Sequence, residues 1–350
     1  MEGSIYNVAL ASFGMSGRVF HGPLLKVHPG FRVTKVLERS KELSRALFPE
    51  AEIVRRWEEI VEDKAVDIVV VNTPDALHYP MAREALEAGK HVVVEKPFTL
   101  TVGEADELIA LARRQERVLT VFQNRRWDSD FLTVKKVIAE GWLGRVVEME
   151  SHFDRYRRYP RKESWKDREG EGTGSIYNLG SHLLDQAVVL FGMPEALFAD
   201  LRVVREGPQV NDYFDIRLYY PGLRVILKHS YLVMKPGPRF AVHGDEGSFL
   251  KYGLDPQEAR LNAGMLPDEA GFGVEEKEQW GYLVSDGALS YDGAYQSVPG
   301  NYLAFYDNLW QVLQGEAAPA VPPEEARDVI RLIELAQQSS REQRVVKVSS

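Results

Sequence analysis

The sequence contains no cysteine. This absence excludes disulfide bonds, catalysis by a thiolate and metal sites built on cysteine. Long apolar runs are absent too, since none reaches the about 20 residues that a membrane-spanning helix needs. The apolar segment from Tyr6 to Ser12 is too short for a signal peptide and lacks its basic flank. We therefore expect a cytoplasmic protein with no membrane partner.

An excess of positive charge is also missing. Lysine and arginine total 43 against 52 aspartates and glutamates, which gives a formal net charge of −9. Proteins that bind nucleic acids normally carry a basic face, so we predict no nucleic-acid partner. The one basic stretch, residues 155–162, is interpreted as a mostly solvated loop from which one or two side chains reach a ligand.

A length of 350 residues favours two domains. Residues 1–125 alternate strand-like and helix-like segments, which is typical of a parallel, doubly wound α/β sheet. The strands are expected at 6–12, 31–38, 66–72, 91–95 and 118–122. The helices are expected at 17–27, 40–48, 79–88 and 101–115.

Residues 126–350 follow a different pattern, with many strands and few helices. Strands are expected at 146–154, 196–206, 213–220, 223–233, 239–244 and 248–252, and helices at 128–140, 178–191, 302–313 and 324–339. The residues from 253 to 300 are rich in glycine and acidic residues and are expected to form irregular loops. The pattern predicts an α+β domain with a mostly antiparallel open sheet. The last helices are expected to pack either on this sheet or on the first domain.

A glycine pattern near the N-terminus indicates a dinucleotide site. Ser12-x-Gly14-Met15-x-Gly17 follows a strand and opens a helix, which is the context that such a fingerprint needs. Gly14 would let a pyrophosphate approach the backbone, and Gly17 would let helix and strand pack closely. Ser12 stands where the usual pattern has its first glycine, and an ordinary turn between strand and helix is the alternative.

The end of the second expected strand bears on the choice of cofactor. Glu38 can accept the adenosine ribose hydroxyls and would repel a 2′-phosphate, which favours NAD slightly. Arg39 and Ser40 follow at once and could hold that phosphate instead, so NADP stays open. The alternative is that Glu38 is simply a solvated residue at the end of a strand.

Two further segments stand at carboxyl ends of expected strands, where open α/β sheets bind ligands. The first runs from Asn72 through Thr73 and Pro74 to His78, and it offers polar groups and a stiff apolar edge to the cofactor, or simply a helix cap. The second is Glu95-Lys96-Pro97, whose lysine points into the ligand crevice.

His182 is the candidate general base, because oxidation of an alcohol requires removal of the hydroxyl proton as hydride leaves. Asn178 precedes it by four residues, so both side chains share one face of a helix. Lys96 can stabilise the developing alkoxide by its charge. Asp185 is interpreted as support or a second polar contact. For His182 the alternative is a packed interface histidine, and neither it nor His152 has the spacing of a metal site, so we predict no metal.

Aromatic and arginine side chains suit a polyhydroxylated ring, because they offer a flat wall and several donors. The candidates for the substrate pocket are Arg126, Trp127, Arg155, Tyr156 and Trp165. The alternative is that the aromatic residues belong to the core and the arginines to the surface.

Together, the Ser12 to Gly17 turn, the Asn72 to His78 loop, Glu95-Lys96-Pro97 and the stretch from Gly172 to His182 resemble the Gfo/Idh/MocA oxidoreductases. The resemblance implies an N-terminal Rossmann domain and a C-terminal domain whose open sheet forms a homodimer or homotetramer. It also implies that Lys96 contacts nicotinamide ribose and substrate hydroxyl and that His182 moves the proton. Family members commonly carry aspartate where this chain has Asn178.

Residues 122–128 and 151–157 further resemble the branch that contains NADP-linked scyllo-inositol dehydrogenases. The sequence thus predicts an NAD(P)-dependent dehydrogenase of a cyclic polyol or sugar-like alcohol, or of its ketone. A different substrate, such as a trans-dihydrodiol or a modified sugar, is one alternative. A low-turnover cofactor-binding sensor is the other, because an amide at Asn178 cannot stabilise a protonated imidazole as a carboxylate does.

Overall fold

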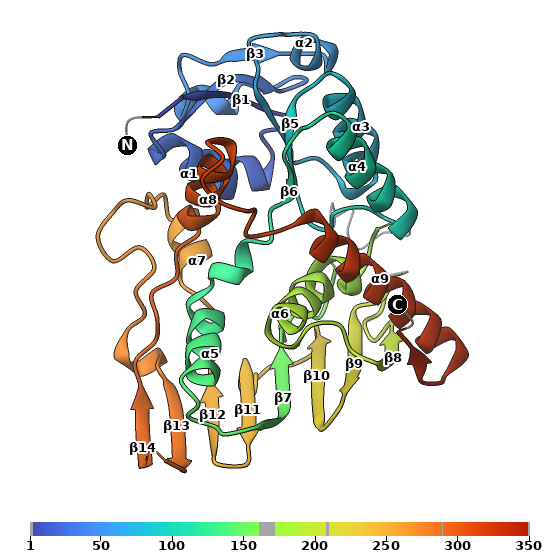
Figure 1. Cartoon of the computed structure of the whole chain (residues 1–350), viewed down its shortest axis with the longest axis vertical. Coiled ribbons are helices and arrows are strands. Elements are labelled where there is room, and N and C mark those ends of the chain that lie inside the picture. Colours follow the sequence, from blue (N-terminus) through green and yellow to red (C-terminus); the bar gives the residue numbers. More distant parts are fainter. Residues whose placement is uncertain (1–2, 161–171, 208–209, 289, 349–350) are drawn as a thin grey trace. The chain divides into compact units, whose positions relative to one another are not determined.

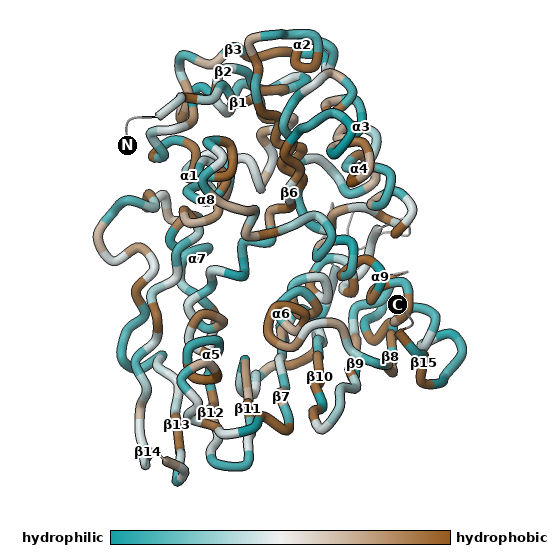
Figure 2. The backbone as a smooth tube through the Cα atoms, in the orientation of Figure 1, coloured by the Kyte–Doolittle hydropathy of each residue, from teal (hydrophilic) through white to brown (hydrophobic). Residues whose placement is uncertain are grey.

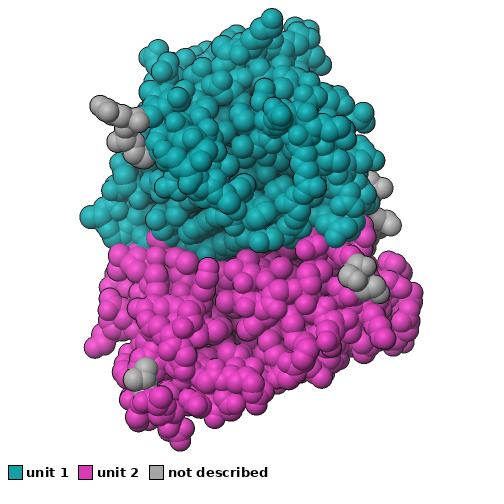
Figure 3. Space-filling view, in the orientation of Figure 1, with its two compact units in different colours: residues 1–127, 256–273, 301–327 teal, residues 128–255, 274–300, 328–350 magenta. Residues whose placement is uncertain are grey.

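The computed structural model describes residues 3–160, 172–207, 210–288 and 290–348 (Figure 1). Contacts between Cα atoms divide the chain into two compact units, which Figure 3 colours separately. Unit 1 comprises residues 1–127, 256–273 and 301–327, and unit 2 comprises residues 128–255, 274–300 and 328–350. Each unit therefore contains segments that lie far apart in the sequence.

Unit 1 is built on a six-stranded parallel sheet with the order β3-β2-β1-β4-β5-β6. The strands are β1 (Tyr6–Leu10), β2 (Phe31–Leu37), β3 (Glu52–Val54), β4 (Ile68–Val71), β5 (His91–Val94) and β6 (Leu119–Val121). Every residue of β4 is buried, as expected for a strand covered on both faces. The centre of the sheet is correspondingly brown in Figure 2. The predicted doubly wound α/β sheet is confirmed.

Helices connect these strands or follow the last of them. They are η1 (Gly17–His21), α1 (Gly22–Val27), η2 (Leu43–Ala46), α2 (Glu58–Val61), η3 (Asp75–Leu77), α3 (His78–Glu87), α4 (Val102–Arg114) and η4 (Asn124–Trp127). Thr101 and Glu104 form a reciprocal capping box at the start of α4. Gly89, at φ +74°, ends the turn after α3, where the sequence has a helix-stop glycine.

Two later helices complete unit 1, α7 (Gln257–Asn262) and α8 (Leu303–Leu313). α8 packs on α1, as Figure 1 also shows. Its buried face includes Phe305, Tyr306 and Leu309, which repeat at the spacing of one helical stripe. A helix from the last fifth of the chain therefore packs on a helix from its start.

Unit 2 is built on a nine-stranded sheet with the order β14-β13-β12-β11-β7-β10-β9-β8-β15. The strands are β7 (Val146–His152), β8 (Ala196–Arg202), β9 (Tyr213–Tyr220), β10 (Leu223–Ser230), β11 (Phe240–Gly244), β12 (Gly247–Lys251), β13 (Gly281–Asp286), β14 (Ser290–Tyr295) and β15 (Val346–Lys347). β7 and β10 pair in parallel, and the other neighbours pair antiparallel. The predicted mostly antiparallel sheet is confirmed.

Helices pack on this sheet. α5 (Ser129–Ala139) packs on β11 and β12, and α6 (Ser181–Phe191) packs on β10. The turn η6 (Ile176–Gly180) precedes α6 and contacts β9 and β10. α9 (Pro323–Glu342) follows α8 and leads to β15.

The expectation of irregular loops from 253 to 300 is wrong, because α7, β13 and β14 lie there. β13 alternates buried Leu283 with exposed Tyr282 and Val284, but its glycine and serines obscure this period in the sequence. Gly281 is required in the strand, since a Cβ there would collide with the ring of Phe249.

The helix expected at 40–48 is also a correction, because only the short 3-10 turn η2 forms there. The carboxylate of Glu38 accepts hydrogen bonds from the N–H groups of Leu43 and Ser44. These bonds fix the segment as a compact loop at the end of β2. Among the described helices, none has the length and apolar content that would let it cross a membrane.

Candidate cofactor and catalytic site

Ser12 and Asn72 join the carboxyl ends of β1 and β4. The N–H of Ser12 donates to Asn72 Oδ1 at 2.9 Å, its hydroxyl donates to the Asn72 carbonyl at 2.7 Å, and Asn72 Nδ2 donates to the Ser12 carbonyl at 2.9 Å. Only the hydroxyl bond depends on the serine side chain, and a glycine at this position, as in the usual fingerprint, could not form it. They also place both residues, as predicted, at the edge where parallel sheets bind ligands.

Gly17 and Gly14 differ sharply in their surroundings. A Cβ on Gly17 would lie 2.8 Å from the Ser12 carbonyl and 3.0 Å from Asn72 Nδ2, so helix and strand approach too closely for a side chain. A Cβ on Gly14 would meet only Ser12 Oγ, at 3.9 Å. The backbone at Gly14 thus faces open space at the start of a helical segment, beside exposed Met15. The unpaired N–H groups at the start of a helix can bind phosphate groups, so a pyrophosphate could approach the backbone here.

Glu38 points into the protein. Its Oε1 accepts the Ser44 N–H at 2.9 Å and the Ser44 hydroxyl at 2.6 Å, and its Oε2 accepts the Leu43 N–H at 2.9 Å. The residue is 6% exposed, whereas Arg39 and Ser40 directly after it are exposed. Arg55 steadies the same loop through the carbonyls of Glu38 and Lys41, at 2.6 and 2.8 Å.

His78 is completely buried, so its ring holds the protein together rather than facing solvent. Its Nδ1 lies 2.7 Å from the carbonyl oxygen of Pro97, and its Nε2 lies 3.0 Å from that of Thr73. His78 therefore ties the loop after β4 to the turn that contains Lys96.

Lys96 is half-buried in the turn after β5. Its backbone N–H donates to Glu95 Oε2 at 3.0 Å. Glu95 Oε1 lies 3.1 Å from His21 Nε2, and His21 Nδ1 lies 2.7 Å from the Tyr306 hydroxyl. Burial alone would raise the pKa of Glu95, but the hydrogen bond from His21, together with the charge of Lys96, holds it below its ordinary value.

The sequence reasoning missed His21 and Tyr306. His21 lies in η1, four residues after Gly17, and Tyr306 lies in α8. Burial raises the pKa of Tyr306 well above 10, so its hydroxyl keeps its proton. A histidine inside an apolar helix face was the one signal available for His21, and nothing local pointed to its partner in the distant α8.

In unit 2, Asn178 and His182 stand where a π-turn meets an α-helix. The sequence predicts a plain helix over 178–191, but Asn178 lies in the π-turn η6 and His182 in the first turn of α6. Single π-turns occur frequently at functional sites. His182 is 5% exposed and Asp185, on the same helix, is 2% exposed, whereas Asn178 is half-buried.

Asn211 anchors the start of this segment, although no sequence motif indicates it. Its Oδ1 accepts the Ile176 N–H at 2.9 Å and the Ser175 hydroxyl at 3.0 Å, and its carbonyl accepts the Ser175 N–H at 2.8 Å. Gly174 has φ +92°, and a Cβ there would approach Asn211 Nδ2 to 2.7 Å. The glycine before Ser175 is therefore needed both for its backbone conformation and for this close contact.

Two of the residues suggested for substrate binding lie in unit 1. Arg126 is 8% exposed and forms an ion pair with Glu325 at 2.7 Å and a hydrogen bond to the Ala320 carbonyl at 2.8 Å. Trp127 packs edge-on against Phe305. Both residues thus have structural partners inside unit 1.

The remaining candidates lie in unit 2. The guanidinium of Arg155 lies over the ring of Phe153, 5.2 Å from its centroid. Tyr156 is 50% exposed and forms an isolated backbone bridge with Leu232. Trp165 lies outside the described residues. In the described part of the chain, no group of three or more histidine and acidic side chains is placed to hold a metal ion.

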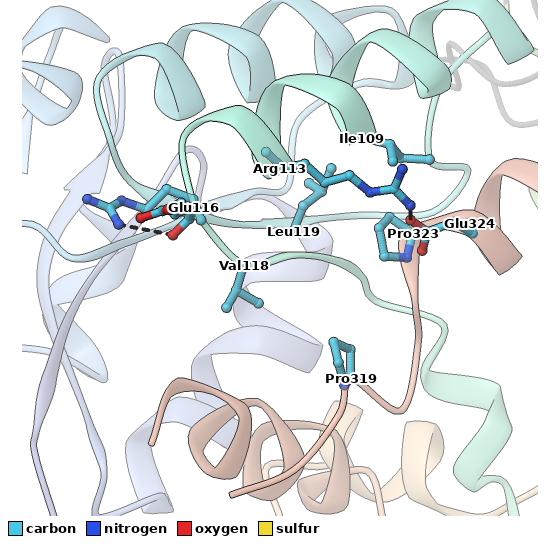
Figure 4. A pocket seen from close by; sticks show the side chains of 10 residues that line it. Ile109, Arg113, Glu116, Val118, Leu119, Pro319, Pro323 and Glu324 are labelled. Carbon is cyan, nitrogen blue, oxygen red and sulfur yellow. Dashed lines mark hydrogen bonds and ion pairs between the residues drawn. The ribbon is translucent and has the colours of Figure 1, made fainter. Parts of the chain in front are cut away.

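A groove of about 220 Å³ lies in unit 1 between the end of α4 and the segment before α9 (Figure 4). An ion pair between Arg113 and Glu324, at 2.7 Å, stands at one end of it. Val118 and Leu119 line it at the start of β6. It therefore lies at the amino edge of the sheet, whereas Gly14, Asn72 and Lys96 follow the carboxyl ends of strands.

Comparison with known proteins decides the family. Residues 6–123 match the model for the NAD-binding Rossmann fold of the Gfo/Idh/MocA oxidoreductases, and residues 135–348 match the model for their C-terminal alpha/beta domain. The chain belongs to the Gfo/Idh/MocA oxidoreductase family. It is thus an NAD(P)-dependent oxidoreductase, and the resemblance predicted from its motifs is confirmed.

Two curated relatives in this family align along nearly the whole chain. YdgJ of Escherichia coli, an uncharacterised oxidoreductase, is 43% identical over 95% of this chain and 96% of its own. IolW of Bacillus subtilis, named scyllo-inositol 2-dehydrogenase (NADP(+)), is 41% identical over 97% of this chain and 95% of its own.

Solved structures of family members agree with the fold. The Bacillus subtilis protein yvaA, provisionally named an oxidoreductase, superposes with a TM-score of 0.96 at 39% identity over 100% of both chains. A Bacteroides fragilis protein with the same provisional description superposes with a TM-score of 0.91 at 48% identity, over 99% of this chain and 100% of its own.

Proposed function

We propose that this oxidoreductase transfers hydride between a nicotinamide cofactor and a cyclic polyol or sugar-like alcohol of the inositol type, or its ketone. The observation that carries the proposal is the edge of the unit 1 sheet. There the Ser12–Asn72 pair, the open backbone at Gly14 and the Lys96 turn follow the carboxyl ends of β1, β4 and β5. The name of the relative IolW, a scyllo-inositol 2-dehydrogenase, supports the substrate class.

The residues present fit a dinucleotide. The N–H groups at the start of η1 would bind the pyrophosphate, and the Thr73 and Pro74 loop would line the nicotinamide side. The cofactor, when bound, accepts or supplies the hydride. No metal ion is part of the proposal.

In the oxidative direction, an imidazole nitrogen of His182 takes the hydroxyl proton while the carbon gives up its hydride. The ammonium group of Lys96 stabilises the negative charge that develops on the substrate oxygen. Asn178 donates a hydrogen bond to a substrate oxygen, and Asp185 supports the helix that bears the base. The products are the ketone, the reduced cofactor and a proton.

The orientation of Glu38 favours NADP over NAD, against the slight preference for NAD that its presence suggests in the sequence. A buried carboxylate that already accepts three hydrogen bonds has little capacity left for ribose hydroxyls. The exposed Arg39 and Ser40 then present a cation and a hydroxyl where a 2′-phosphate would lie. The relative IolW is also named for NADP(+).

The open sheet of unit 2 supports a homodimer or homotetramer. On β9 the side chains of Tyr213, Asp215 and Arg217 alternate with fully buried Phe214 and Ile216. Size-exclusion chromatography with light scattering tests this assembly. A cytoplasmic location, the substrate contacts of Arg126, Trp127, Arg155, Tyr156 and Trp165, and the domain division at residue 125 stay predictions.

The decisive experiment is a turnover screen over inositols, aldoses and dihydrodiols, following the absorbance of reduced cofactor with NAD and with NADP. Oxidation of an inositol supports the proposal, and turnover of dihydrodiols or other sugars alone replaces its substrate class. Tight cofactor binding without turnover across the panel would instead favour a sensor.

A further inference from the structure

Three buried side chains connect distant parts of unit 1 beneath Lys96. Tyr306 comes from α8, His21 from η1, and Glu95 directly follows β5. The hydroxyl of Tyr306 lies 2.7 Å from His21 Nδ1, and His21 Nε2 lies 3.1 Å from Glu95 Oε1. The second carboxylate oxygen of Glu95 accepts the Lys96 N–H at 3.0 Å.

If the imidazole ring of His21 is neutral, only one arrangement of protons satisfies all of these hydrogen bonds. An ionised carboxylate accepts and cannot donate, so His21 Nε2 bears a proton and donates it to Glu95. Nδ1 then has a lone pair, which accepts the Tyr306 hydroxyl. Burial of Tyr306 keeps that hydroxyl protonated, because it raises its pKa. Each group therefore fixes the tautomer and orientation of the next.

We propose that Tyr306, His21 and Glu95 form a positioning relay that holds the backbone of Lys96 and provides a fixed negative charge that acts electrostatically on its ammonium group. The inference rests on the proposed function, in which that ammonium group stabilises the substrate oxygen. Tyr306 and His21 are positioning residues, because they act on Lys96 through Glu95.

A purely structural role does not explain why this set of hydrogen-bonded side chains includes the charged carboxylate of Glu95. A buried carboxylate costs several kcal/mol to desolvate, and apolar side chains of similar size often stabilise a core better. Phe122 packs on His21 with ring centroids 4.3 Å apart, so little water can reach the relay. The charged or titratable groups that face Glu95 are His21, Lys96 and His78, and Tyr306 lies behind His21.

The first test measures Lys96 without any substrate. The rate at which acetic anhydride modifies its ε-amino group is followed against pH by mass spectrometry in the full-length protein. Glu95→Gln keeps the shape of the side chain and removes its charge, so the midpoint of labelling should move to lower pH. His21→Gln and Tyr306→Phe should move it in the same direction by less. An unchanged midpoint in all three variants overturns the relay.

The second test uses turnover. Tyr306→Phe removes one buried hydroxyl and should lower kcat about tenfold, which corresponds to one lost buried hydrogen bond. Cofactor affinity should stay unchanged. In a Lys96→Ala background the same substitution should have no further effect, since the relay acts only through the lysine. An equal loss in both backgrounds overturns the inference.

Tyr6→Phe is the matched control. The hydroxyl of Tyr6 donates to the Leu313 carbonyl at 2.9 Å, at the far end of α8, and does not touch the relay. This variant should lose stability without a change in the labelling midpoint or in kcat. Circular dichroism identifies any variant that fails to fold, and Tyr306→Phe then decides, as the smallest change. If the wild type turns over no substrate, the proposed function fails while the labelling test still decides the relay.

Discussion

Ser12 and Asn72 exchange three hydrogen bonds across the carboxyl ends of β1 and β4, and these bonds occupy the hydroxyl of Ser12 and the side-chain amide of Asn72. The pair joins the two segments that follow these strands. It also sets how closely η1 approaches the sheet, because Gly17 packs against both residues.

Ser12→Gly restores the glycine of the usual fingerprint and removes one of the three bonds. We expect a loss of about 1 kcal/mol in the free energy of unfolding, since a typical hydrogen bond contributes that much. Asn72→Ala should cost more, because it removes two bonds. Urea unfolding measures both, and a Ser12→Gly protein as stable as the wild type would show that the serine bond contributes nothing.

Gly14→Val should abolish cofactor binding and leave the fold intact. The new side chain would occupy the open space beside Gly14, where the pyrophosphate is proposed to lie, and it would meet little of the protein. Gly17→Ala is the contrasting variant, because its Cβ would lie 2.8 Å from the Ser12 carbonyl and destabilise the protein itself. Calorimetry on folded Gly14→Val protein checks the result, and undiminished affinity would be evidence against this site.

Arg39→Ala should weaken NADP binding by about 10- to 100-fold, the range for a lost hydrogen bond to a charged group. NAD binding should hardly change. Arg45→Ala is the control, since this arginine lies on the same loop but pairs with Glu42. Dissociation constants for both cofactors measure the effect. Equal losses for NAD and NADP would contradict a 2′-phosphate site at Arg39.

His182→Ala should lower kcat by about 10²- to 10⁴-fold, as expected for a lost general base. Lys96→Ala should lower turnover comparably and can also weaken substrate binding. Asn178→Asp should lower activity as well, because a carboxylate would face the substrate oxygen as a second acceptor. If the aspartate instead raises the imidazole pKa and shifts the pH–rate profile upward, the amide is not a donor to substrate. Wild-type rates in folded His182→Ala across the whole pH range would refute the mechanism.

Acid should destabilise the protein through His91 and His229. Burial lowers the pKa of each from 6.5 to about 4. The unfolded chain therefore binds their protons more tightly than the folded protein, and stability is lost as the pH falls from about 6.5 towards 4. In the wild type, His91 Nδ1 accepts a hydrogen bond from the Val118 N–H. The asparagine in His91→Asn can still accept this bond but cannot be protonated. Thermal melts should show a shallower acid decline in this variant, and parallel curves would rule out its contribution.

Local sequence patterns predicted most of the fold because the apolar periods are strong. The fully buried run at β4, for example, is visible in four consecutive residues. β13 and β14 were missed because glycine and serine interrupt their alternation. The helix expected at 40–48 failed because the tertiary bond from Glu38 overrode local propensity.

The candidate site was predicted where a motif is contiguous, as at Gly14 and Lys96. The direction in which Glu38 points could not be predicted, since its partners Leu43 and Ser44 are backbone and hydroxyl donors of a type found in any loop. Asn211 and Tyr306 were invisible for another reason. Each acts on a residue far away in the sequence, 35 positions from Ile176 in one case and 285 from His21 in the other.

The position of α8 has a consequence for how this protein is made in the cell. Residues 301–327 belong to unit 1, so this unit is incomplete until they have left the ribosome, although all six strands of its sheet precede them. During synthesis, the nascent chain therefore exposes the surface of α1 that α8 later covers, while unit 2 is being translated. Over the same interval, His21 lacks its hydrogen bond to Tyr306. A ribosome that stalls before residue 301 would release an incomplete unit 1 with exposed apolar surface, which chaperones and proteases recognise.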